Sequence, residues 1–192
     1  MIELSLHILD IVQNSLQANA SEVEICVEDN RIENKYAISV KDNGTGMDAE
    51  TIKKVLDPFY TSKNKKTGLG IPLFKQHAEQ CGGSLEIESE PGNGTKVSVW
   101  FENNHFDRQP MGDITGTICG LIRSYVDVHF IYKHKVDEDE FVLDTDELKN
   151  ELDGIPLQTP EVIKFISDMI KTNIEELESN RNISKKQTIN NA

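Results

Sequence analysis

The amino-acid sequence predicts an α/β (α+β) fold, a two-layer sandwich in which a mixed, mainly antiparallel sheet carries helices on one face and a small α+β extension follows. Three observations support this prediction. Segments with helical and with strand periodicity alternate over the first 103 residues, the strand-like segments come in two consecutive pairs, and a short polar turn joins each pair. Strands joined by short turns pair antiparallel, so the helices between them are expected to cover one face of their sheet.

The first segments are a helix and a strand pair. Residues 3–18 carry apolar side chains at helical spacing, from Leu4 to Leu16. Beside them runs a polar stripe made of His7, Asp10, Asn14 and Gln17. Residues 22–29 alternate between apolar and polar, and residues 36–40 follow after a polar turn. We expect these two strands to pair antiparallel, with one half-buried face.

Two helices and a loop come next. A short helix over residues 48–56 begins at Asp48, whose side chain is a suitable N-cap. A polar loop over residues 57–67 separates it from a helix over residues 70–80, which has Pro72 in its first turn and a Gly-Gly pair after its end. These features predict two further helices in the layer that covers the sheet.

A second strand pair completes this part of the chain. Residues 84–89 and 95–101 alternate between apolar and polar positions. Between them lies the turn signal Pro91-Gly92-Asn93-Gly94. We therefore expect a hairpin that belongs to the same antiparallel sheet as the first strand pair.

The remaining residues predict an α+β extension and a tail. The sequence divides into a first domain over residues 1–103, an extension of unknown role over residues 104–178 and a disordered tail over residues 179–192, which is rich in Asn, Ser, Lys and Gln. The elements expected in the extension are a helix over 111–124, a hairpin made of 128–136 and 140–143, and helices over 145–152 and 160–177.

Composition and charge argue against several classes of protein. The formal net charge is −13 and no segment forms a basic stripe, so nucleic acid is not expected as a partner. No stretch approaches the roughly 18–20 apolar residues that a membrane-spanning helix needs, which predicts no membrane partner. The three cysteines lack the paired spacing of a disulfide framework or a zinc site, and the N-terminus lacks a signal sequence. These features predict a cytoplasmic protein.

Two paired-glycine turns predict a nucleotide site. The first is Asp42-Asn43-Gly44-Thr45-Gly46, and the second is Thr67-Gly68-Leu69-Gly70. Glycines let backbone amides approach a bound group closely and permit positive φ. The acid at position 42 offers an acceptor for a base edge, the lysines between the turns offer charge for phosphates, and Asn14 offers a neutral oxygen for a hard cation. Together these groups predict a site for ATP and Mg²⁺.

The motifs resemble the GHKL superfamily of ATP-binding domains, which includes gyrase-type topoisomerases, heat-shock chaperones, MutL-type mismatch-repair proteins and sensor histidine kinases. From Ile38 to Phe101 the resemblance is to sensor histidine kinases, carried by the two glycine turns and by Asp57-Pro58-Phe59-Tyr60-Thr61-Ser62-Lys63, Gly82-Gly83 and Gly92-Asn93-Gly94-Thr95. The helix differs, because Asp10-Ile11-Val12-Gln13-Asn14 resembles the mismatch-repair version, in which an acid precedes the asparagine by four residues. The resemblance implies a Bergerat-type fold for residues 1–103.

The resemblance also implies roles for individual residues. Asn14 matches the magnesium ligand of the superfamily, and Asp42 matches the acid that accepts a hydrogen bond from the adenine amino group. Further nucleotide contacts are implied for Gly44, Gly46, Lys63, Lys66, Thr67, Gly68, Leu69, Gly70 and Thr95.

Asp10 leaves two interpretations open. ATPases and serine kinases of this superfamily place a glutamate at the corresponding position as the base, whereas histidine kinases usually have asparagine there. Aspartate is one methylene shorter than glutamate, so its reach differs. Asp10 is therefore either a catalytic base or a structural polar group on the helix.

The function predicted first is a Mg-ATP-binding, histidine-kinase-like protein that lacks sensor and phospho-acceptor domains. It would transfer the γ-phosphate to a partner protein or to water, by positioning and charge stabilisation, and the partner would supply the signal and the acceptor. Two alternatives are an anti-sigma-type serine kinase and an ATP-gated protein-interaction module with little turnover. The sequence leaves open the phosphate acceptor, the input signal and the oligomeric state.

Overall fold

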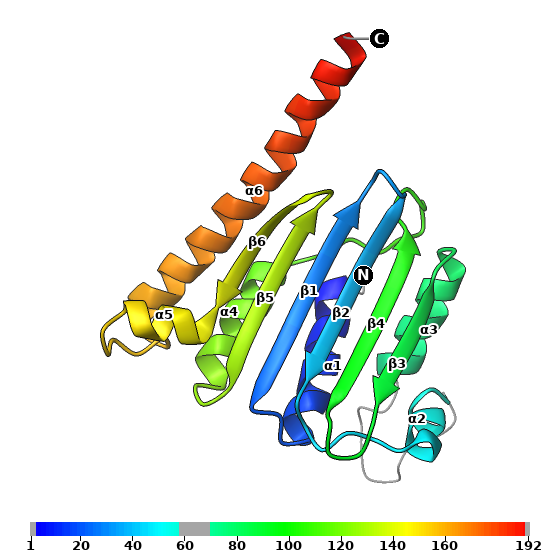
Figure 1. The fold of residues 1–192 in the computed structure, drawn as a ribbon, viewed down its shortest axis with the longest axis vertical. Coiled ribbons are helices and arrows are strands. Elements are labelled where there is room, and N and C mark those ends of the chain that lie inside the picture. The colour runs from blue at the N-terminus through cyan, green and yellow to red at the C-terminus, as the bar shows by residue number, and fades with distance from the viewer. Residues whose placement is uncertain (1–2, 58–69, 191–192) are drawn as a thin grey trace.

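Strands with alternating inward and outward side chains pair into one sheet. A computed structural model describes residues 3–57 and 70–190, with side chains described as far as residue 180. The strands in this part of the chain are β1 (Glu22–Asn30), β2 (Lys35–Asp42), β3 (Ser84–Ser89), β4 (Thr95–Glu102), β5 (His129–Val136) and β6 (Asp139–Asp144). Their order is β3-β4-β2-β1-β5-β6; β1 and β5 are parallel and the other neighbours are antiparallel (Figure 1).

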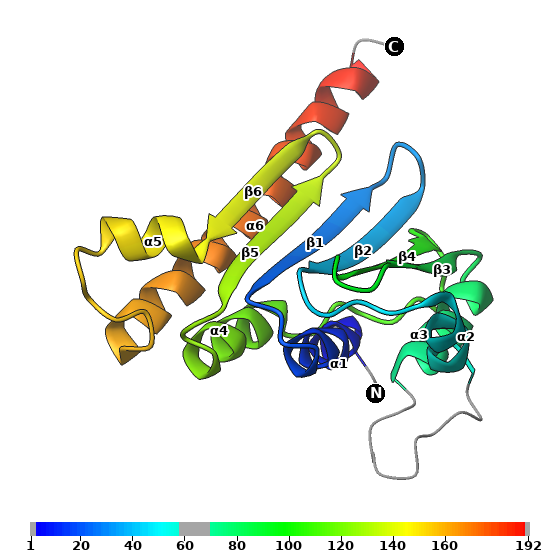
Figure 2. The ribbon, with the colours of Figure 1, turned by 60° about the horizontal axis from the view of Figure 1, so that its bottom comes forward.

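The long helices lie on one face of this sheet. The helices of the described residues are α1 (Leu4–Gln17), α2 (Ala49–Val55), α3 (Gly70–Gln80), α4 (Ile114–Ser124), α5 (Thr145–Glu151) and α6 (Pro160–Asn190). In Figure 2, α1 and α4 lie side by side beneath the sheet, α3 packs under β3 and β4, and α6 runs along β5 and β6. The predicted two-layer sandwich, with a mixed and mainly antiparallel sheet, is confirmed.

The core lies between the sheet and these helices. On β2, Tyr36, Ile38 and Val40 are buried, whereas Lys41 on the opposite face is exposed. Large side chains from all parts of the chain are fully buried in the same core, including Phe74, Phe101, Phe130, Tyr132 and Ile166. Burying one such side chain contributes about 1.5–3 kcal/mol, so this shared core is the main force that holds the two layers together.

Most predicted elements agree with the structure within one or two residues, but α4 begins later than expected. The sequence predicts a helix from Met111, and α4 starts at Ile114. The side chain of Asp113 accepts a hydrogen bond from the Gly116 amide at 2.8 Å, which makes Asp113 the N-cap. Gly112 has a φ of +75°, which is not helical, so the helix cannot begin before it.

The end of the chain differs from the prediction of a disordered tail over residues 179–192. α6 does not stop near residue 177 but continues to Asn190. Between Pro160 and residue 190 the sequence contains neither proline nor glycine, so it lacks the residues that most strongly oppose a helix. Residues 191–192 lie outside the described part of the chain. No helix within the described ranges combines the length and the apolar character needed to cross a membrane.

β5 joins the C-terminal extension to the sheet of the first 103 residues. It pairs with β1 from Glu22 opposite His129 to Asp29 opposite Val136. The Lys133 ammonium also lies 2.8 Å from a carboxylate oxygen on β1. The extension therefore shares both the sheet and the core of the N-terminal part, a pairing that the sequence pattern does not predict.

His129 connects β5 to two neighbouring elements. Its Nδ1 lies 3.3 Å from Glu22 Oε2, and its Nε2 lies 2.8 Å from Asp144 Oδ1. Burial lowers the pKa of His129, but the hydrogen bond and charge of Asp144, helped by Asp146 and Glu22, outweigh burial and raise the pKa above its usual 6.5. The stabilisation from this ion pair is therefore fully present below the unfolded-state pKa and is lost as the pH rises through the folded-state pKa.

We expect His129→Gln to lower the melting temperature more at about pH 5.5 than at about pH 8.5, because only the charged imidazole gains from its acidic neighbours. Thermal unfolding of both proteins in matched buffers measures this difference. His105→Gln is the control, because it changes a histidine that makes no ion pair among the described side chains. Equal losses at the two pH values would contradict the assignment.

Candidate functional site

α1 presents two polar side chains one helical turn apart. Asp10 and Asn14 are both exposed, and residues four apart lie on the same side of a helix. The opposite side of α1 is held against the core by Ile8, Ile11 and Val12, which are at most 4% exposed. Packing of the apolar stripe thus fixes the direction in which the two polar side chains point.

Asp42 ends β2 and is held by hydrogen bonds from three sides. It is 8% exposed. Its Oδ2 accepts from the Ser15 hydroxyl at 2.5 Å, and its Oδ1 accepts from the amides of Gly44 at 2.9 Å and Thr95 at 3.2 Å. A carboxylate has about four acceptor positions, so one remains for a further donor. Because Ser15 directly follows Asn14, the fold brings Asn14 and Asp42 to the same region.

The first glycine turn is fastened to the end of α1. Asn43 Oδ1 accepts hydrogen bonds from the amides of Ser21 at 2.9 Å and Glu22 at 3.0 Å. The amide of Thr45 donates to the carbonyl of Ala18 at 2.9 Å. These hydrogen bonds therefore hold the turn that follows Asp42 against the C-terminal end of the helix that carries Asn14 and the segment that follows this helix.

Gly46 and Gly94 let this turn pack against the β3–β4 hairpin. Gly46 has a φ of +67°, and a Cβ there would lie 1.9 Å from the carbonyl oxygen of Glu90. Gly94 has a φ of +78°, and a Cβ there would lie 2.0 Å from the carbonyl oxygen of Asp42. No side chain fits at either position, so both glycines are required for the turn to lie where it does.

The first turn of α3 lies beside Asp10. A Cβ on Gly70, where α3 begins, would lie 2.9 Å from Asp10 Oδ2. Free amides at a helix N-terminus attract negative charge, so this end of α3 suits a phosphate as well as the neighbouring carboxylate. The structure thus brings Asp10, Asn14, Asp42 and Gly70 to adjacent parts of the helical face.

The other predicted nucleotide contacts cannot be placed. Lys63, Lys66, Thr67, Gly68 and Leu69 lie outside the described residues. Thr95 is placed, and its hydroxyl lies 2.9 Å from that of Ser89 while its amide donates to the predicted adenine acceptor.

Residues 2–105 match a protein family described as histidine kinase-, DNA gyrase B- and HSP90-like ATPases. The matched residues make up more than half of the chain. The chain belongs to this ATPase family. The predicted resemblance is confirmed, and family membership implies that ATP is the ligand.

Sensor kinases are among the relatives of this ATPase domain. Sporulation kinase C of Bacillus subtilis is 35% identical over 91 residues, which are 47% of this chain and 21% of that protein. Sensor histidine kinase ZraS of Escherichia coli is 30% identical over 105 residues, which are 55% of this chain and 23% of that protein. The catalytic domain of histidine kinase ThkA aligns with a TM-score of 0.43 at 24% identity, covering 54% of this chain and 68% of that one. The chain therefore spans about a fifth of the length of the two curated relatives.

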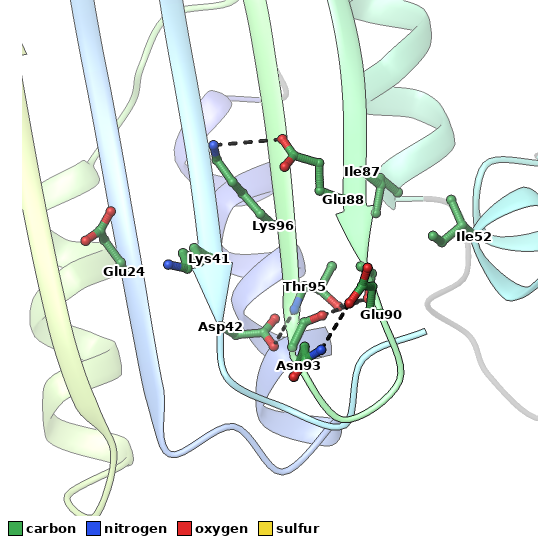
Figure 3. A pocket seen from close by; sticks show the side chains of 12 residues that line it. Glu24, Lys41, Asp42, Ile52, Ile87, Glu88, Glu90, Asn93, Thr95 and Lys96 are labelled. Atoms are coloured by element: carbon green, nitrogen blue, oxygen red, sulfur yellow. Dashed lines mark hydrogen bonds and ion pairs between the residues drawn. The ribbon is translucent and has the colours of Figure 1, made fainter. Parts of the chain in front are cut away.

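A groove of about 770 Å³ lies on the open face of the ATPase domain's sheet, away from α1 (Figure 3). Lys41 and Lys96 line it together with Glu24 and Glu88, and the Lys96 ammonium lies 3.9 Å from the Glu88 carboxylate. Asp42 borders the groove only at the end of its strand. Since four carboxylates and two lysines line this groove, its charge does not suit a triphosphate.

Sequence reasoning missed two features of the ATPase site. The hydrogen bond from the Ser15 hydroxyl to Asp42 was not predicted. The sequence does hint at it, because Ser15 is a small polar residue on the buried stripe of α1, four residues after Ile11. His7 was placed on the polar stripe, but it is only 5% exposed and stacks on the Phe74 ring at 4.4 Å between centroids. No local pattern indicates this burial, because the stacking partner lies on a distant helix.

Proposed function

We propose that this ATPase domain binds Mg-ATP on the helical face, between α1 and the start of α3, and passes the γ-phosphate to a partner protein or to water. The observation that carries the proposal is the anchored Asp42 carboxylate, which keeps one acceptor position for the adenine amino group. The start of α3 beside Asp10 offers amides to the phosphates. The acidic groove on the other face offers no comparable phosphate site.

Asn14 is the residue proposed to hold Mg²⁺. Its side chain is exposed, one turn from Asp10, and supplies a neutral amide oxygen. Mg²⁺ usually keeps several waters and takes its other ligands from one or two protein oxygens and the substrate phosphates. One amide oxygen beside a phosphate site therefore fits this ion. When bound, Mg²⁺ would neutralise charge that develops on the phosphates.

We expect Asn14→Ala to remove the magnesium-dependent part of ATP affinity while the fold stays intact, because the side chain is exposed and lies outside the buried core. Calorimetric titration with ATP in the presence and absence of magnesium measures this part separately. Asn180→Ala on α6 is a control on an exposed helical asparagine far along the chain. Magnesium dependence that survives in Asn14→Ala would assign the metal to other ligands.

Asp10 is the proposed base that activates the attacking hydroxyl or water. It lies next to Gly70, at the start of α3, where the γ-phosphate would sit. The Asp10 carboxylate also favours serine or water over histidine as the phosphate acceptor, since an imidazole acceptor needs no base near neutral pH. Both kinase alternatives use the same ATP site, and the acid at position 10 favours the serine kinase.

We expect Asp10→Asn to lower phosphate release or transfer by about 10²–10⁴-fold without weakening ATP binding, because the amide keeps the shape of the side chain but cannot accept the proton. Incubation with γ-labelled ATP and candidate partner proteins measures transfer. Acid stability of the product distinguishes the acceptors, because phosphoserine survives acid and phosphohistidine does not. Unchanged turnover would remove Asp10 from the mechanism and favour a structural role.

The partner would be a protein and not a nucleic acid, since the net charge is −13. A cytoplasmic setting is part of the same proposal. An ATP-gated interaction module with little turnover is the remaining alternative, and it predicts ATP binding of the same strength with phosphate release slower than about once per hour.

A further inference from the structure

The segment Asn103–Asp113, called here the connecting segment, contacts each helix that borders the proposed ATP site. The carbonyls of Pro110 and Met111 accept hydrogen bonds from the amides of Leu4 at 3.0 Å and Ser5 at 2.9 Å. These amides belong to the first turn of α1, which has no side-chain cap. The connecting segment therefore supplies the main-chain acceptors that the start of α1 needs.

Gln109 lies between α1 and α3. Its main-chain amide donates to His77 Nε2 on α3 at 3.2 Å. His7 on α1 packs against the same helix, because its ring stacks on the Phe74 ring of α3 at 4.4 Å between centroids. One residue thus connects the helix that carries Asp10 and Asn14 to the helix that begins beside Asp10.

Both residues that pack against α3 here carry a buried polar atom that lacks a partner. His7 Nε2 and Gln109 Oε1 are both buried, and neither has a hydrogen-bond partner among the described residues. Burial lowers the pKa of His7, an effect that the Asp10 charge and the Gln109 amide partly offset, so the imidazole is neutral near pH 7. A neutral imidazole that carries its proton on Nε2 is a donor, and the Gln109 oxygen is the acceptor that matches it. Leaving both unpaired costs free energy, because neither buried group recovers the hydrogen bonds that it would make with water.

We propose that Gln109 is a positioning residue, whose side-chain oxygen accepts a hydrogen bond from His7 Nε2 and so sets α1 relative to α3 in the geometry that ATP binding requires. Gln109 and the rest of the chain after residue 105 lie outside the part that matches the ATPase family. The connecting segment leads directly into α4, the first helix of the C-terminal extension. Through Gln109 the extension would therefore influence the affinity for ATP. This inference rests on the proposed function.

The test compares two substitutions at one position in the full chain. Gln109→Met keeps the length of the side chain but removes the acceptor, and Gln109→Glu keeps an oxygen at the same place. We expect Gln109→Met to weaken ATP binding about tenfold in calorimetry, because ATP affinity falls with the fraction of molecules that keep the binding geometry, and Gln109→Glu to stay within about threefold of the wild type. Ile170→Val, in the core of α6, is the control for a general loss of stability.

The protonation of His7 gives a second readout that a general loss of stability does not change. We expect the ¹⁵N NMR shifts of the His7 imidazole to show a proton on Nε2 in the wild type, and a changed Nε2 shift in Gln109→Met. The wild-type measurement tests the tautomer that the hydrogen bond requires, even if Gln109→Met does not fold. An unprotonated Nε2 in the neutral wild-type ring would overturn the proposal.

The outcomes separate this inference from the proposed function. If the wild type binds ATP and Gln109→Met binds it equally well, Gln109 does not position the site, and ATP binding stands. If the wild type binds no ATP, the proposed function fails, and the proposal that Gln109 positions an ATP site fails with it. In that case the NMR measurement still reports whether His7 carries the proton that a hydrogen bond to Gln109 needs. A loss of affinity as large in Ile170→Val as in Gln109→Met would also overturn a specific positioning role.

Discussion

Asp42→Ala is expected to weaken the binding of ATP and ADP by about ten- to hundredfold, because a hydrogen bond to a charged acceptor contributes about 1.5–3 kcal/mol. The same substitution is expected to leave the binding of inorganic tripolyphosphate within about threefold, since the phosphate groups do not depend on this carboxylate. Parallel calorimetric titrations with ATP and tripolyphosphate measure both effects.

Asp42→Ala also removes the acceptor of three internal donors, so a stability control is required. The amides of Gly44 and Thr95 and the hydroxyl of Ser15 lose their partner, and each buried donor left unpaired costs about 1–3 kcal/mol. Titrations should therefore be done well below the melting temperature of the variant. Asp127→Ala, an exposed turn residue, is the matched control. Equal losses for ATP and tripolyphosphate would contradict adenine recognition by Asp42.

A chain that ends after residue 105 is expected not to fold as a stable unit. Truncation removes β5, the parallel partner of β1, and exposes a strand edge in the middle of the sheet. It also removes Ile118, Phe130 and Tyr132 from the shared core, and each is worth about 1.5–3 kcal/mol. Because a domain of this size has a net stability of only about 5–15 kcal/mol, the loss of these three side chains alone is comparable to its whole stability. Circular dichroism with thermal unfolding measures the result.

A second truncation provides the control. A chain that ends after residue 180 keeps Leu177, the last buried residue of α6 among the described side chains, and is expected to unfold in one cooperative transition like the full chain. A cooperative transition for residues 1–105 at nearly the full-chain melting temperature would show that the ATPase domain is independent of its extension. That result would also argue against the proposal that the connecting segment sets the geometry of the ATP site.

Local signals were enough to predict the elements. α3 and β3 have the predicted boundaries, because glycine pairs and a proline mark where the helix and the hairpin begin and end. The two glycine turns and Asn14 were predicted as site residues for the same reason, since their chemistry is visible over a few consecutive residues, and their roles stay a prediction. ATP followed from several such motifs in one order.

Contacts between distant segments could not be predicted in this way. The parallel pairing of β5 with β1 joins strands about a hundred residues apart, and alternation alone does not choose a partner strand. The burial of His7 depends on Phe74, and the role of Ser15 depends on Asp42. α6 exceeded its predicted end because a polar composition suggested disorder, although it contains no residue that breaks a helix.

If α1 and the first glycine turn form a site that recognises adenine and holds Mg-ATP, the full chain should prefer ATP to GTP. Calorimetric titration with each nucleotide, with and without magnesium, measures this preference. Adenine carries an amino donor where guanine carries an oxygen acceptor, so Asp42 should attract the first base and repel the second. We expect magnesium-dependent ATP binding at least about tenfold tighter than GTP binding. Equal affinity for the two nucleotides, or no binding of either, would contradict the account.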